Sequence, residues 1–122
     1  MEAAEKTYAR IIGKVRQAGL TPIVMSMPAM DAERYYQFFT SVFSDEEKRN
    51  VSRWLKNGAE AIWAGHELYN DAIKRVAAAT DAMLVDVSKA FSQPDKYLCI
   101  DGIHVNAMGQ TKIAAAIAHA II

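Results

Sequence analysis

The sequence is poor in several features that mark particular classes of protein. It has one cysteine, Cys99, and three prolines among 122 residues, so it can form no internal disulfide and offers no cysteine cluster for a metal. Its 14 basic and 14 acidic side chains give no net charge, whereas nucleic-acid-binding proteins usually carry a basic excess. No apolar run approaches the roughly 20 residues that span a bilayer. We therefore expect no nucleic acid, no membrane span, no metal and no other cofactor.

What the chain does have is a large apolar fraction without obvious divisions. Hydrophobic residues make up 52% of the sequence, which is typical of a globular domain with a packed core. There is no internal repeat, no low-complexity tract and no linker rich in glycine and serine. The sequence therefore predicts a single domain over residues 1–122.

Helical and strand-like patterns alternate along this domain. Apolar residues recur at helical spacing over residues 3–18, and Gly19 follows as a helix stop. Two short apolar runs then read as strands: TPIVMSM at 21–27 and AMLVDVS at 82–88. A long helical stretch separates them and a final helix follows the second, so the pattern predicts an α/β fold with parallel strands. Strands of this composition are typically buried on both faces.

An aromatic-rich helical insert occupies residues 29–56. It contains most of the aromatic surface of the chain, in the segment ERYYQFFTSVF: Tyr35, Tyr36, Phe38, Phe39 and Phe43. These rings either line a substrate cleft or partner surface, or pack the insert onto the rest of the domain.

The sequence also predicts local features of the helices between the strands. Ser44 stands three residues before Glu47, which is the spacing of a capping box at a helix start. Asn57 and Gly58 are expected to bend or interrupt the helical stretch, because glycine costs about 1 kcal/mol relative to alanine inside a helix. His66 reads as a packing or surface histidine, since a metal site would need further ligands nearby.

Asp101 and His104 are the candidate catalytic residues. They lie in the stretch DGIHVNAMGQ, after the second strand and before the last helix, which Asn106 is expected to cap. Active sites of open α/β sheets lie beyond the carboxyl ends of the strands. There, an aspartate can orient a histidine through one ring nitrogen and leave the other facing a solvent-accessible cleft as a base. The alternative is an ordinary loop that carries an acid and an imidazole.

The longer string DGIHVNAMGQTKIAAAIAHAI resembles the last block of the SGNH (GDSL-type) hydrolases, an Asp-x-x-His followed by an asparagine, a glycine and a final helix. The segments YARIIGKVRQAGLTPIVMSMPAM and YNDAIKRVAAATDAMLVDVSKAF are similar to helices and strands that precede this block in the family. The resemblance implies a three-layer, flavodoxin-like parallel-sheet fold. It also implies that His104 is the general base toward a serine nucleophile and that Asp101 orients it. The substrate would be an ester, which could be a small molecule, a lipid or an acetylated sugar.

The chain departs from this family pattern in its missing blocks. The Gly-Asp-Ser block that supplies the nucleophile is absent, as are the glycine block and the Gly-x-Asn-Asp block of the oxyanion hole. None of the serines has the required setting: Ser26, Ser41, Ser44, Ser52, Ser88 and Ser92. The resemblance therefore implies the C-terminal part of an SGNH hydrolase, with about two strands and several helices. We expect this chain alone to be inactive.

A non-catalytic helical interaction or scaffold module is the alternative function. Two parallel strands leave a strand edge open, which an isolated domain tolerates poorly. We expect either a missing N-terminal half or a second copy in a homo-oligomer to complete the domain.

Overall fold

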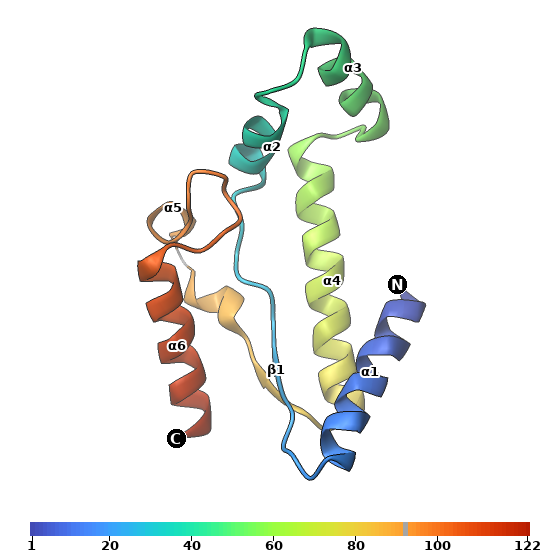
Figure 1. Cartoon of the computed structure of the whole chain (residues 1–122), viewed down its shortest axis with the longest axis vertical. Coiled ribbons are helices and arrows are strands. Elements are labelled where there is room, and N and C mark those ends of the chain that lie inside the picture. Colours follow the sequence, from blue (N-terminus) through green and yellow to red (C-terminus); the bar gives the residue numbers. More distant parts are fainter. Residues whose placement is uncertain (92) are drawn as a thin grey trace.

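The computed structural model describes residues 1–91 and 93–122. No described helix combines the length and the apolar character needed to cross a bilayer. The elements follow one another along the chain as labelled in Figure 1. They are α1 (Glu2–Gln17), β1 (Ile23–Met25), α2 (Ala32–Thr40), α3 (Asp45–Trp54), α4 (Ala59–Ala79), β2 (Met83–Val85), the 3-10 helix η1 (Val87–Ala90), α5 (Pro94–Tyr97) and α6 (Ala107–Ile121).

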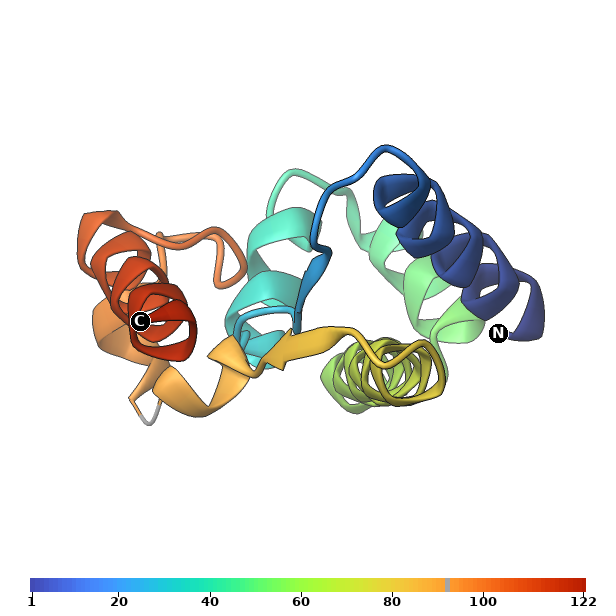
Figure 2. The same cartoon turned by 90° about the horizontal axis from the view of Figure 1, so that it is seen from below.

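The two strands form a parallel sheet between layers of helices. Residues 23–25 of β1 pair in register with residues 83–85 of β2. α1 and α4 lie on one side of this sheet and α6 lies on the other, as Figures 1 and 2 show. The α/β architecture and the parallel strands predicted from the alternating pattern are therefore confirmed.

The predicted helix boundaries are confirmed at three places. α1 ends just before Gly19, which has a φ of +76°, a conformation that glycine adopts without steric cost. The Ser44 hydroxyl accepts a hydrogen bond from the Glu47 N–H at 3.3 Å, and the Glu47 carboxylate accepts one from the Ser44 N–H at 2.8 Å. Gly58, with a φ of +51°, separates α3 from α4.

The core joins α1 and α4 to one face of the sheet. Ile12 of α1, Val24 of β1, and Val76 and Ala77 of α4 form a cluster of buried side chains. Each is at most 5% exposed. Burial of these side chains stabilises the packing of α1 on the sheet, at about 25 cal/mol per Å² of apolar surface removed from water.

The prediction that the strands are buried on both faces was wrong. Val24 is 2% exposed, but its neighbours Ile23 and Met25 are 45% and 38% exposed, and Met83 of β2 is 44% exposed. Successive side chains of a strand point to opposite faces, so α1 and α4 cover one face while the other is partly open. The reason is that α6 reaches only part of the second face.

The aromatic insert forms α2 and α3, and its rings pack against one another. Phe39 is central: its ring centroid lies 5.3 Å from that of Tyr35, 5.6 Å from that of Tyr36 and 6.1 Å from that of Phe43. α2 also packs along α4. These contacts agree with the packing interpretation of the insert.

Candidate functional site

The predicted catalytic residues lie in a closed loop between α5 and α6. Leu98 and Val105 form an antiparallel bridge at its base. Inside this bridge the Cys99 N–H donates to the His104 carbonyl at 2.7 Å, and the Gly102 N–H donates to the Cys99 carbonyl at 3.0 Å. Backbone hydrogen bonds thus fix the shape of the loop.

Asp101 holds His104 through both of its carboxylate oxygens. Oδ1 accepts hydrogen bonds from the backbone N–H groups of Ile103 at 3.1 Å and His104 at 3.0 Å. Oδ2 is hydrogen-bonded to Nδ1 of the His104 ring. The predicted contact between the two side chains is present, whereas their catalytic role stays a prediction.

Asp101 and His104 have the charge and the orientation that a general base and its orienting acid require. The His104 ring nitrogen, then the His104 backbone N–H, stabilise the Asp101 carboxylate and lower its pKa from 3.8 to about 2. A carboxylate acceptor favours the tautomer in which Nδ1 carries the proton, which leaves Nε2 with a lone pair. Nε2 has no hydrogen-bonding partner among the described residues, and the His104 side chain is 75% exposed.

The Asp101–His104 turn is docked on the start of α2. The Asp31 N–H donates to the Gly102 carbonyl at 2.9 Å, while the Asp31 side chain caps α2 by accepting from the Arg34 N–H at 3.0 Å. Gly102 has a φ of +77°, and a Cβ there would lie 2.7 Å from the Asp31 carbonyl oxygen and 2.9 Å from the Tyr35 nitrogen. Only glycine allows this close approach.

Asn106 connects the same turn to α6. As predicted, it caps this helix, because its Oδ1 accepts from the Gly109 N–H at 2.9 Å. Its Nδ2 donates to the Lys96 carbonyl at 2.9 Å, so one side chain fixes both α6 and the end of α5.

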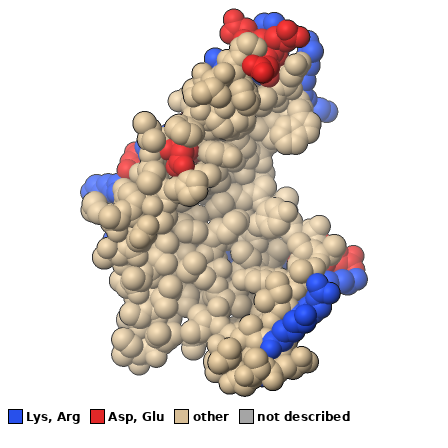
Figure 3. Space-filling view, in the orientation of Figure 1, with Lys and Arg blue, Asp and Glu red and all other residues tan. Residues whose placement is uncertain are grey.

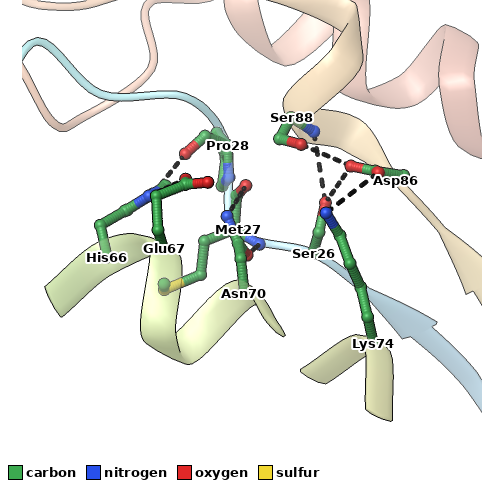
Figure 4. Close-up of polar contacts among 9 residues, drawn as sticks. All are labelled: Ser26, Met27, Pro28, His66, Glu67, Asn70, Lys74, Asp86 and Ser88. Carbon is green, nitrogen blue, oxygen red and sulfur yellow. Dashed lines mark hydrogen bonds and ion pairs between the residues drawn. The ribbon is translucent and has the colours of Figure 1, made fainter. Parts of the chain in front are cut away.

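A second polar cluster, not predicted from the sequence, lies at the carboxyl ends of the strands (Figure 4). The Ser26 hydroxyl, which follows β1 and is 0% exposed, donates to Asp86 Oδ1 at 2.9 Å. The Ser88 hydroxyl donates to the same oxygen at 2.5 Å, and Lys74 Nζ lies 3.6 Å from Oδ2. The sequence signal for this cluster is a polar residue directly after each strand, Ser26 after β1 and Asp86 after β2.

The charge of Asp86 is stabilised by this cluster. Partial burial raises the pKa of its carboxyl, but hydrogen bonds from Ser88 and Ser26 and two nearby lysines lower it more, so the pKa lies below its ordinary value. Ser26 is buried, and its hydroxyl also accepts from the Ser88 N–H at 3.2 Å. The cluster therefore joins the ends of the two strands.

Two α4 side chains hold the segment after β1. Asn70 Oδ1 accepts from the Met27 N–H at 2.7 Å, and His66 Nε2 lies 2.8 Å from the Pro28 carbonyl oxygen (Figure 4). The His66 ring also stacks on Trp63, with centroids 5.6 Å apart. The prediction of a packing histidine is confirmed.

A mainly apolar hollow of about 350 Å³ lies beside the turn. Its lining comes from the segment after β1, α2, α4 and the turn: Met27, Pro28, Met30, Tyr35, His66 and Ile103. Ile103 lines it but His104 does not, so this hollow is not the cleft expected at the free nitrogen of His104.

None of the described serines hydrogen-bonds to His104, and Ser92 lies outside the described residues. Within the described part of the chain, no group of three or more histidine, cysteine, aspartate or glutamate side chains is placed to hold a metal ion.

No protein-family model, curated protein or solved structure matches the chain.

Proposed function

We propose that Asp101 and His104 are the orienting acid and the general base of a serine ester hydrolase of the SGNH type. The observation that carries this proposal is the hydrogen bond from His104 Nδ1 to the Asp101 carboxylate, in an imidazole whose other nitrogen is unpartnered among the described residues. This is the arrangement that a base needs toward a hydroxyl nucleophile.

The nucleophile and the oxyanion donors would come from polypeptide outside this chain. Nε2 of His104 would take the proton of a serine hydroxyl as its oxygen attacks the ester carbonyl carbon. The protonated ring would then give this proton to the departing alcohol, and a water activated by the same nitrogen would release the acid. Asp101 would stabilise the imidazolium in both steps.

We further propose that the chain is the C-terminal part of a three-layer, flavodoxin-like SGNH fold. The support for this assignment is the general α/β arrangement, with parallel strands between α1 and α4 on one side and α6 on the other. The substrate would be an ester of a small molecule, a lipid or a sugar. The hollow beside Ile103 suits the apolar portion of such a substrate, because five of its six lining side chains are apolar or aromatic: Met27, Pro28, Met30, Tyr35 and Ile103.

The three histidines allow a direct test in this chain, by carbethoxylation with diethyl pyrocarbonate at about pH 8, where ordinary histidines are neutral. We expect His104 to react about tenfold faster than the exposed His119 of α6, because the Asp101 carboxylate stabilises the positive charge that develops on the ring. His66 should react slowest, since its side chain is 10% exposed and both ring nitrogens are engaged. Rates for each histidine come from mass spectrometry of peptides.

Asp101→Asn is the matched variant. It should slow His104 to the rate of His119 and leave both other histidines unchanged. Equal rates for His104 and His119 in the unaltered chain, or a His104 rate that Asp101→Asn does not change, would remove the basis of the proposal.

A further inference from the structure

The molecule exposes more surface than a folded chain of its size normally does. Its accessible surface is 8067 Å². A compact monomer of 13.5 kDa is expected to expose about 6,500 Å². The excess of about 1,500 Å² is the amount that one subunit buries in a large, permanent interface.

Part of the exposed apolar surface lies around β1. On the open face of the sheet, Ile23, Met25 and Met83 are 38% to 45% exposed, and Leu20, before β1, is 64% exposed. α6 carries one formally charged side chain, Lys112, yet only its Gly109 is buried. In Figure 3 the charged side chains gather at the tip formed by α3, beside α5 and on α1, and the surface between α1 and α6 is uncharged.

The outer edge of β1 is available for pairing. β1 pairs only with β2 among the described residues, and the Ser26 N–H donates to the Val85 carbonyl. Backbone groups alternate in direction along a strand, so those of Ile23 and Met25 point away from β2. Asn70 binds the Met27 N–H and closes the ladder there. The free edge therefore ends at Met25.

The helix layer is wider than the sheet that it covers. A helix is about 10 Å across with its side chains, and neighbouring strands lie about 4.8 Å apart. α1 and α4 lie side by side and together span the width of about four strands, whereas this sheet has two in the described part of the chain. Figure 2 shows β1 between α1 and α6, with β2 below β1 and α4 below α1 in that view. The difference in width corresponds to about two further strands, on the β1 side of the sheet.

We infer that this surface binds a partner polypeptide that adds two apolar β-strands beside β1 and a helix over the open face of the sheet. A second copy of this chain fits less well, because each copy would bring its own α1 and α4 and place four helices over four strands. Because the chain has no net charge, its charge does not favour a strongly charged partner. The inference does not depend on the hydrolase proposal and holds equally for an interaction module.

A labelled strand peptide tests the surface in the full chain. The probe copies residues 21–27, with two lysines added at its C-terminus for solubility, and its binding is followed by fluorescence polarisation up to millimolar concentration. We expect saturable binding that Ile23→Lys weakens by at least about tenfold. Val42→Lys is the matched control, because Val42 is apolar and 83% exposed but lies between α2 and α3; it should bind the peptide as the unaltered chain does.

Amide exchange in the unaltered chain gives a readout that does not depend on how the variants fold. The N–H groups of Ile23 and Met25 should exchange at least about tenfold more slowly when the peptide is bound. Absence of saturable binding, unchanged exchange at both amides, or equal weakening by Val42→Lys would overturn the inference. A discrete dimer of the chain alone that Ile23→Lys dissociates would overturn it in favour of a second copy.

Discussion

Replacing His104 by alanine is expected to reduce ester turnover by a factor on the order of 10⁴ to 10⁶ once the chain is assembled with the polypeptide that supplies the nucleophile. Without the imidazole, a serine hydroxyl has no acceptor for its proton, and the leaving alcohol has no donor. Asp101→Asn should reduce turnover by a factor that is about one to two powers of ten smaller than for His104→Ala. In this variant the ring remains but loses its preferred tautomer and the stabilisation of its positive charge.

Steady-state kinetics of the assembled enzyme with a p-nitrophenyl ester gives these factors. The change should fall on kcat, with KM little affected, since the pair acts in the transition state and does not hold the ground-state substrate. His119→Ala is the control, because this histidine lies in the last turn of α6; ordinary turnover is expected. Ordinary turnover in His104→Ala would mean that the Asp101–His104 turn is a structural loop.

Gly102→Ala is expected to destabilise the chain by about 3 kcal/mol, a large part of the 5–15 kcal/mol typical of a domain. Two effects add. A non-glycine residue at a φ of +77° costs about 1–2 kcal/mol, and the new methyl group would meet the backbone of Asp31 and Tyr35 at 2.7 and 2.9 Å. Backbone at a helix start cannot move aside cheaply, so relief requires the turn to leave α2.

Gly13→Ala is the matched control for this prediction. Gly13 lies inside α1, and a Cβ there would have nothing within 4 Å, so this substitution should stabilise the chain by about 0.5–1 kcal/mol. Urea unfolding followed by circular dichroism measures both. If Gly102→Ala were as stable as the unaltered chain, the close contact between the turn and α2 would be wrong.

The parts of the site that could be predicted depend on neighbours in the sequence. The Asp101 carboxylate binds N–H groups two and three residues ahead, and Asn106 caps α6 through a residue three positions on. Spacing alone determines whether such contacts can form. The two strands were located for a similar reason, since a short apolar run between helical patterns has few other interpretations.

The parts that could not be predicted depend on pairing between distant segments. The contact between Ser26 and Asp86 joins residues 60 positions apart and follows from the register of β1 with β2, which no local pattern encodes. The exposure of Ile23 and Met25 was missed because an apolar composition shows what a strand can bury, but not which layers are present to cover it. Both the Ser26–Asp86 contact and the exposure of Ile23 and Met25 depend on which elements pair with β1 and pack over it.

The pKa of Asp101 most directly tests the central claim that this carboxylate holds the His104 ring. We predict a pKa of about 2 in the unaltered chain, measured by NMR titration of the side-chain carboxyl. We also predict a rise toward its ordinary value in His104→Ala, where the main stabilising hydrogen bond is lost. Because the folded-state pKa is lowered, the pair stabilises the fold above about pH 4, and this contribution is lost as the pH falls toward about 2. An ordinary pKa in the unaltered chain, or a lowered pKa that His104→Ala leaves unchanged, would contradict the account.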